Sequence, residues 1–352
     1  MGTTTETVNS IDAEKAGQLG VLLVNTGTPD APTKEAVQRY LKGFLGDRRI
    51  VNIPPLIWRP ILNSFVLHAR PRKTLAIYQS IWTEQGSPYT LHSQALERAI
   101  TQQLTEQGHD GKVVRMAHRY GNPSMRDGLA EFQQLGIEQV MVVPLYPQEA
   151  FATTGSAHDE LKRQLAALDY HPSLSFVQNY FDDAAYLSAV VEHIRPRLCP
   201  TQPGSKLVFS FHSIPLKDRR NGDPYQEQVI ATTQKLADLL QLPAGSWSVA
   251  YQSRFDDAQR WLGPYLADEA KRFVDEGVTD LYVYCPGFAV DCTETLYDIE
   301  QKVRGELERY AHKQAGCVAF RLHYIPALND ALAHAQALVQ VITQALPAEK
   351  TG

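Results

Sequence analysis

A histidine at the end of a short apolar run is the residue of this sequence best placed to do chemistry. The run Leu-Val-Phe-Ser-Phe, residues 207–211, leads into His212 and is followed by a turn at Pro215. Strand-forming residues bounded by turn residues predict a buried β-strand. His212 would then lie at the carboxyl end of a strand, where open α/β sheets bind their ligands. A neutral imidazole there could bind a divalent metal or accept a proton, although a histidine beside a strand is often only structural.

A second strand-and-turn segment, residues 282–298, offers carboxylates that could act with His212. Glu294 and Asp298 lie one helical turn apart where the following helix is expected to begin. One imidazole and one carboxylate would form a weak, open metal site that can release its ion. Asp291 and Glu294 also have the spacing of a capping box, so Glu294 could instead bind the helix backbone.

Composition limits the class of protein. A chain of 352 residues suggests two domains, and 43% hydrophobic with 21% charged residues is ordinary for a globular protein. A formal charge of −5 argues against a nucleic-acid partner. The cysteines, Cys199, Cys285, Cys292 and Cys317, are too widely spaced for a C-x-x-C site and too few for a disulfide scaffold, which favours the cytoplasm.

The sequence contains no pattern typical of a membrane-spanning helix or of a secretory signal. No stretch has the roughly 18 consecutive apolar residues that a spanning helix needs. Residues 1–18 lack the pattern of a secretory signal, and we expect them to be a disordered lead-in.

The strand signals repeat in two halves of the chain. Strands alternate with helices, which predicts an α/β fold of two similar, doubly wound, parallel-sheet (Rossmann-like) domains whose carboxyl-end loops face one cleft. The strand-and-turn segments are 21–29, 113–122 and 139–147, then 207–215, 246–254 and 280–286. We expect the halves at 19–185 and 186–327, with a C-terminal helix in 328–352 that packs back on the first half.

The first half is longer because of an insertion, expected at about 47–92. Residues 47–73 interleave apolar residues with arginines and prolines. Such a segment could lie against an apolar ligand or a membrane surface, with its cations toward lipid phosphates. An ordinary core helix with a solvated basic end is the alternative. Because prolines interrupt helices, we expect a lip beside the site rather than an uninterrupted helix.

Eight short motifs between residues 19 and 330 occur in a characteristic order. They are Leu-Val-Asn-Thr-Gly-Thr-Pro (23–29), Ser-Pro (87–88), Arg-Tyr-Gly-Asn-Pro (119–123), Leu-Tyr-Pro-Gln (145–148) with Thr-Thr-Gly-Ser (153–156), Phe-Ser-Phe-His-Ser-Ile-Pro (209–215), Tyr-Gln-Ser-Arg (251–254), Trp-Leu-Gly-Pro (261–264) and Asp-Cys-Thr-Glu-Thr-Leu-Tyr (291–297). Together they resemble the ferrochelatase family. The resemblance implies insertion of ferrous iron into protoporphyrin IX, giving protohaem and releasing two protons, as the last step of haem synthesis.

The resemblance also implies roles for single residues. His212 falls on the family's active-site histidine and Glu294 on its partner carboxylate, both assigned to metal binding and proton removal. Asp298 matches an acidic ladder thought to carry metal or protons, but the next rung, near Lys302, is not acidic here. Cys292 stands where many relatives carry a histidine. Its thiol could bind a soft metal, or it could be a buried, inert cysteine.

The porphyrin itself needs flat walls and donors for its propionates. Tyr120 and Trp261 are expected against the ring, although either could be a core residue. Arg119, Ser213 and the arginine-rich insertion are candidate propionate ligands. We expect protoporphyrin IX and ferrous iron as substrates, no tightly bound cofactor and no iron–sulfur cluster, and a cytoplasmic protein with peripheral contact at the inner membrane face.

Two other functions remain open from the sequence. One is a carrier of the same fold that binds a tetrapyrrole or a metal without chemistry. The other is a chelatase for another metal or macrocycle, such as cobalt or coproporphyrin.

Overall fold

The computed structural model describes residues 18–198, 204–254, 260–315 and 320–346. Their strands form two sheets of four parallel strands each. The first has the order β2-β1-β3-β4, from Lys112–His118, Leu19–Asn25, Gln139–Pro144 and Ser173–Phe176. The second repeats it as β6-β5-β7-β8, from Trp247–Gln252, Ser205–His212, Asp280–Tyr284 and Arg321–Ile325. The predicted duplication of a doubly wound parallel fold is confirmed.

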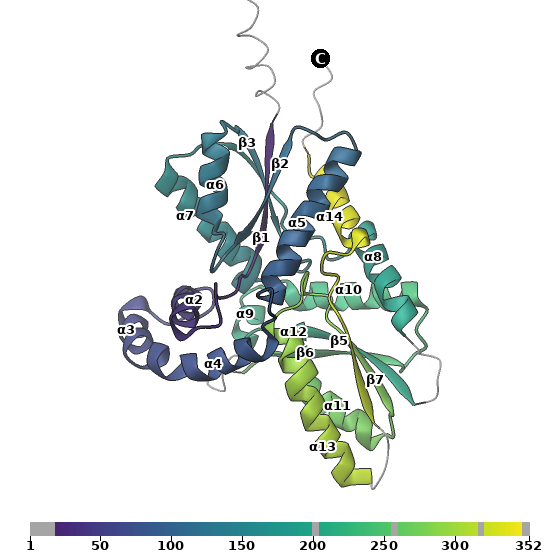
Figure 1. Cartoon of the computed structure of the whole chain (residues 1–352). Coiled ribbons are helices and arrows are strands. Elements are labelled where there is room, and N and C mark those ends of the chain that lie inside the picture. Colours follow the sequence, from purple (N-terminus) through teal and green to yellow (C-terminus); the bar gives the residue numbers. More distant parts are fainter. Residues whose placement is uncertain (1–17, 199–203, 255–259, 316–319, 347–352) are drawn as a thin grey trace, which may run out of the picture.

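The central strands owe their positions to their apolar sequences. All seven residues of β1 are buried, and so are all five residues of β7. Helices cover both faces of each sheet, and strands buried on both faces are nearly continuous hydrophobic runs (Figure 1). The fourth strand of each sheet, β4 and β8, was not predicted. Both are edge strands with polar residues and only partial burial.

Helices surround the two sheets, and the C-terminal helix expected in residues 328–352 is present as α14 (Leu332–Gln344). They are α2 (Lys34–Gly46), α5 (Pro88–Glu106), α6 (Met125–Gln134), α7 (Ser156–Leu168), α8 (Ala184–Ile194), α9 (Leu216–Arg220), α10 (Tyr225–Leu240), α11 (Leu266–Asp275), α12 (Thr293–Leu296), α13 (Arg304–Ala315) and α14 (Leu332–Gln344). Thr33 caps α2, accepting a hydrogen bond from the backbone N–H of Ala36. The C-terminal helix α14 packs against α5 of the first half and against α8.

The insertion forms a lip that projects from the body of the molecule beside α2 (Figure 1). It consists of α3 (Pro55–Ile61), a π-helical turn (Leu62–Val66) and α4 (Leu67–Ile81). Pro60 and Pro71 lie inside helices, so the expectation that prolines would break the segment is wrong. One π-helical turn between α3 and α4 changes the hydrogen-bond spacing instead. Trp58 Nε1 donates to the Leu45 carbonyl at 2.7 Å and ties the lip to α2.

Candidate active site

A cavity lies where the carboxyl ends of the two sheets face each other. The loops after β1, β2, β3, β5 and β7 line it, together with side chains of α2 and α4 from the first half. It contains about 1500 Å³ of space between protein atoms, its open mouth included. Residues from both halves of the chain line it, many of them aromatic, so the cavity offers a broad apolar surface to a ligand.

His212 ends β5 and lines the cavity. Its Nδ1 lies 2.7 Å from the backbone carbonyl oxygen of Ser213. Because a carbonyl can only accept, Nδ1 must carry the ring proton, and Nε2 then keeps its lone pair. No residue that the structure describes forms a hydrogen bond with Nε2. The backbone of the β5 turn thus prepares His212 as a base or metal ligand.

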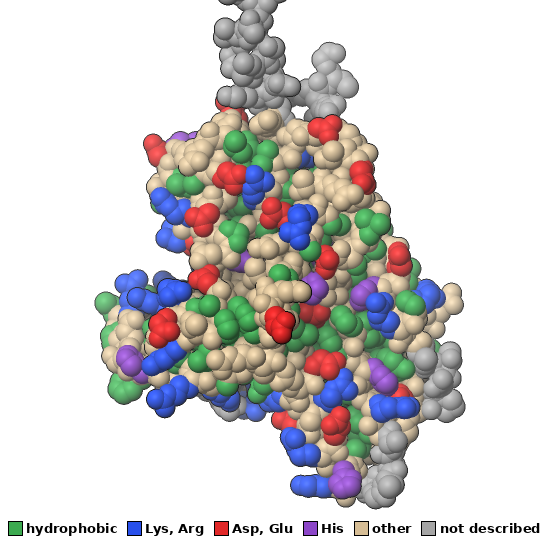
Figure 2. Space-filling view, viewed as in Figure 1, with side chains coloured by type: hydrophobic (Ala, Val, Ile, Leu, Met, Phe, Trp, Pro, Cys, Tyr) green, Lys and Arg blue, Asp and Glu red, His purple; other side chains and the backbone are tan. Residues whose placement is uncertain are grey.

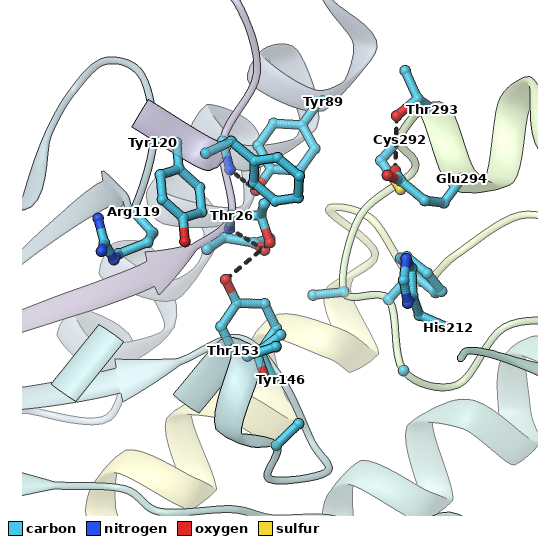
Figure 3. Close-up of a pocket in the computed structure, with 18 of the residues that line it drawn as sticks. Thr26, Tyr89, Arg119, Tyr120, Tyr146, Thr153, His212, Cys292, Thr293 and Glu294 are labelled. Atoms are coloured by element: carbon cyan, nitrogen blue, oxygen red, sulfur yellow. Dashed lines mark hydrogen bonds between the residues drawn. The ribbon is translucent and has the colours of Figure 1, made fainter. Parts of the chain in front are cut away.

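Glu294 lies on the same side of the cavity as His212 (Figure 3). The capping alternative is wrong, because α12 follows Cys292 and the Cys292 backbone N–H donates to the Thr295 hydroxyl at 3.0 Å. The Glu294 carboxylate instead accepts a hydrogen bond from the Thr293 hydroxyl at 2.8 Å. This leaves carboxylate lone pairs for a cation or a proton in the cavity.

Cys292 lines the cavity next to these two residues. Burial, together with the neighbouring Glu294 carboxylate, raises the pKa of the thiol well above its ordinary value. A raised pKa keeps the sulfur protonated near neutral pH, whereas metals bind the thiolate.

Asp298 lies outside the cavity wall, at the start of a π-helical turn (Asp298–Val303) that follows α12. The Ser253 hydroxyl donates to its Oδ2. Burial raises the pKa of Asp298 despite that hydrogen bond. The next acid, Glu300, forms a salt bridge with Arg304 at 2.7 Å.

The four expected porphyrin ligands, Tyr120, Trp261, Arg119 and Ser213, all line the cavity. Two of them have donors that are already engaged. The Arg119 guanidinium binds Asp47 at 2.5 Å and Glu160 at 3.4 Å, and the Ser213 hydroxyl donates to the Leu262 carbonyl at 2.7 Å. In this arrangement neither offers its main donor to a carboxylate ligand, whereas Tyr120 and Trp261 present aromatic rings.

Of a wall of tyrosines in the cavity, the sequence analysis predicted only Tyr120. The tyrosines that line the first-half side of the cavity are Tyr40, Tyr78, Tyr89, Tyr120 and Tyr146. Burial raises the pKa of each, so each phenol is neutral. Three of them, Tyr89, Tyr120 and Tyr146, lie in or beside the motifs quoted above, and this position could have drawn attention to the other two as well as to Tyr120.

The hydroxyl groups of this wall are held by the chain itself. The Gly27 backbone N–H donates to Tyr89 Oη at 2.8 Å, and Tyr146 Oη lies 3.0 Å from Thr26 Oγ1 (Figure 3). Gly27 has a φ of +104°, and a Cβ there would lie 1.7 Å from the Tyr120 carbonyl oxygen. Only glycine fits this approach. The tyrosines therefore turn ring surface toward the cavity, which suits a flat aromatic ligand.

Comparisons with known proteins agree with this geometry. The family model described as Ferrochelatase matches residues 18–346. The ferrochelatase of Alcanivorax borkumensis is 43% identical over 325 residues, covering 92% of this chain and 93% of the relative. The ferrochelatase of Methylococcus capsulatus is 43% identical over 329 residues, covering 93% and 96%.

Solved structures are similar in fold at low sequence identity. The sirohydrochlorin chelatase SirB of Bacillus subtilis subspecies spizizenii, in complex with cobalt, has a TM-score of 0.50 at 12% identity, covering 93% of this chain and 95% of that chain. DR2241 of Deinococcus radiodurans has a TM-score of 0.53 at 12% identity, covering 95% of this chain and 56% of that chain.

Proposed function

The chain belongs to the ferrochelatase family, and from this we propose that His212 and Glu294 are the residues that pass ferrous iron to the porphyrin and remove its protons. The enzyme inserts ferrous iron into protoporphyrin to give protohaem, a lyase reaction. The observation that carries the proposal is that the lone pair of His212 Nε2 and the Glu294 carboxylate are both available on one side of the cavity.

The reaction exchanges one Fe²⁺ for two N–H protons of the porphyrin, so the site needs bases and a weak metal ligand. His212 can accept a pyrrole proton at Nε2, because its Nδ1 proton is donated to the Ser213 carbonyl. Glu294 supplies a hard oxygen ligand for Fe²⁺. One nitrogen and one oxygen bind the ion loosely enough that the four pyrrole nitrogens can take it.

We assign Asp298 to the outward proton path. Its pKa is raised by burial, so it holds a proton more readily than an exposed aspartate does. It lies one turn beyond Glu294 and can receive protons from that side. Cys292 lies beside this path as a neutral thiol.

The tyrosine wall and Trp261 are proposed to hold the macrocycle. Broad aromatic surfaces bury large apolar area, and this binding energy can support distortion of the ring toward the reactive geometry. Arg119 and Ser213 then shape the cavity through their hydrogen bonds to Asp47 and Leu262. A role as propionate ligands would require them to exchange these partners.

The lip is proposed to dock on a membrane surface, with the protein in the cytoplasm at the inner face. No helix in the described ranges combines the length and the apolar character that crossing a bilayer requires. On the lip, however, Leu56 is 92% exposed, Phe65 71% and Ile57 59%. Figure 2 shows hydrophobic side chains together with Lys and Arg at the end of the lip. Apolar side chains flanked by cations are suited to an anionic lipid interface.

Vesicle binding tests this docking. Wild type is expected to sediment with vesicles that contain anionic lipid, and Leu56→Ser/Phe65→Ser is expected to stay in the supernatant. Ile230→Ser removes a side chain of similar exposure, 54%, on α10 and should bind like wild type. Equal binding by the lip variant would refute the docking.

We propose that no resident cofactor is needed, iron–sulfur clusters included. The four cysteines are widely spaced along the chain, and Cys285 and Cys292 are free thiols that lie on the β7 side of the cavity. Iron and sulfide analysis of anaerobically purified protein should find less than one equivalent of each; stoichiometric iron and sulfide would contradict the proposal.

The proposed site is tested by mixing the enzyme with protoporphyrin IX and Fe²⁺ under anaerobic conditions and following the porphyrin absorbance bands. Wild type should form the metalloporphyrin and release two protons per iron, read with a pH indicator. The double variant His212→Ala/Glu294→Gln should do neither. Turnover by the double variant at the wild-type rate would move the chemistry elsewhere.

A further inference from the structure

Gln252 is the last residue of β6 and lies behind the cavity wall, with only 5% of its surface exposed. In the sheet it pairs with His212. Its backbone carbonyl accepts a hydrogen bond from the Ser213 N–H at 2.9 Å, and the Ser213 carbonyl in turn holds His212 Nδ1. The backbone of Gln252 is thus connected to the histidine turn.

The side chain of Gln252 reaches from β6 across the end of β5 to the segment after β7. Its Oε1 accepts from the Ser210 hydroxyl of β5 at 2.5 Å and from the Cys285 thiol at 3.5 Å. Its Nε2 donates to the backbone carbonyl of Glu294 at 2.6 Å. One buried amide therefore contacts β5, the residue that follows β7 and α12, and so touches both elements that carry the proposed catalytic pair.

We infer that Gln252 is a positioning residue that fixes the Glu294 turn relative to the His212 turn. The inference rests on the proposed function of those two residues. It needs an amide, because one end of the side chain must accept two hydrogen bonds while the other donates one. A buried network of this kind holds its members rigidly only when every partner is satisfied.

The next residue strengthens the same connection. Ser253 has a φ of +58°, a left-handed conformation that is uncommon for a residue other than glycine. In this conformation its hydroxyl donates to Asp298, one turn beyond Glu294. The end of β6 thus holds the Glu294 backbone through one residue and the Asp298 carboxylate through the next.

Gln252→Met removes the polar amide at similar length, and Gln252→Glu keeps the acceptors but loses the donor to Glu294. A misplacement of about 1 Å in a reacting group can cost 10²-fold in rate. We expect both variants to lower kcat/KM for Fe²⁺ by about 30-fold, on that scale. The Kd for protoporphyrin, measured by fluorescence quenching, should stay within about twofold, because Gln252 does not line the cavity.

Gln103→Met is the matched control. Gln103 is a buried glutamine on α5, 8% exposed; it hydrogen-bonds to Glu106 and does not line the cavity. It should lower the thermal midpoint as Gln252→Met does, without changing either constant. Wild-type kcat/KM in both Gln252 variants, or an equal loss in Gln103→Met, would overturn the inference. His212→Ala and Glu294→Gln run in the same assay, and full activity there would instead show that the proposed site is wrong.

Discussion

Asn25 and Thr26 line the cavity at the end of β1. His212 lines it at the end of β5, which is the corresponding strand of the second sheet. Asn25 is paired with His118 in its sheet as His212 is paired with Gln252 in the other, so the two positions correspond. The Asn25 side chain is turned back to the Thr26 backbone, at 2.8 Å. The imidazole of His212 keeps one nitrogen for the cavity.

The two walls around these positions differ in the same way. The first-half wall consists of neutral tyrosines, and three of their hydroxyls are bound by the chain itself. The second-half wall carries His212, Glu294 and the thiol of Cys292. A duplicated fold provides two equivalent sets of strand ends, so one can hold a flat substrate while the other carries the groups that exchange metal and protons.

The largest loss of activity is expected from a change on the second-half wall. Glu294→Gln keeps the shape of the side chain but removes the charge that a cation needs. Because loss of a catalytic acid or base typically costs 10²–10⁴-fold, kcat should fall by about 10³-fold in the anaerobic insertion assay. Thr293→Val, which removes only the hydrogen bond to Glu294 Oε2, should cost less than about tenfold. Equal losses in the two variants would mean that the carboxylate acts only structurally.

Asp298→Asn should separate chemistry from stability. The pKa of Asp298 is raised by burial, so its ionised form is unfavourable in the folded protein. The stability linked to this residue is therefore present below the ordinary aspartate pKa and is lost as pH rises through the raised value. Asn, which still accepts from Ser253, should raise the thermal midpoint at pH 8 but not at pH 3.5, while activity falls by about tenfold.

A lower midpoint for Asp298→Asn at pH 8 would show that the carboxylate stabilises the fold. Unchanged activity would remove Asp298 from the proton path.

A change on the first-half wall is expected to have a smaller effect, which is limited to porphyrin binding. Tyr89→Phe leaves the buried Gly27 N–H without its acceptor, which costs about 1–3 kcal/mol of folding stability. The Kd for protoporphyrin should rise by about fivefold, which corresponds to less than the roughly 1.4 kcal/mol of a tenfold change in affinity. The kcat at saturating porphyrin should stay within about twofold of wild type. Tyr170→Phe loses a comparable hydrogen bond, to the Ile137 carbonyl, and should change stability alone. A fall in kcat for Tyr89→Phe would mean that the first wall also takes part in chemistry.

The smallest effect is expected at Cys292. Because burial and Glu294 raise the thiol pKa, the sulfur is protonated at neutral pH and contributes little as a ligand. Cys292→Ser should therefore keep kcat and the KM for Fe²⁺ within about twofold, since the hydroxyl is also neutral. A tenfold or greater rise in the KM for Fe²⁺ would make Cys292 a metal ligand and extend the second wall.

Much of the fold could be predicted because six strands have largely apolar sequences and most of them are followed by turns with Gly, Pro or Asn. The two missed strands, Ser173–Phe176 and Arg321–Ile325, carry polar residues at a sheet edge, where burial does not impose an apolar pattern. His212 could be found because the end of a parallel strand is a ligand position.

Other features of the site depend on contacts between residues far apart in the sequence. Arg119 forms an ion pair with Asp47, which lies 72 residues away in the sequence. The sequence around either residue therefore does not predict this contact. The cap of α12 depends on the extended backbone of Cys292, so the spacing of Asp291 and Glu294 suggested the wrong residue. The tyrosine wall consists of residues from three helices and two loops, and only the folded chain brings them together.

The division between a binding wall and a reacting wall is tested most directly by giving His212→Ala both substrates and recording its absorption spectrum under anaerobic conditions. The account predicts a spectrum of bound protoporphyrin, with Kd within about twofold of wild type by fluorescence quenching, and no metalloporphyrin on the wild-type timescale. Metalloporphyrin formed at the wild-type rate, or loss of porphyrin binding together with turnover, would contradict it.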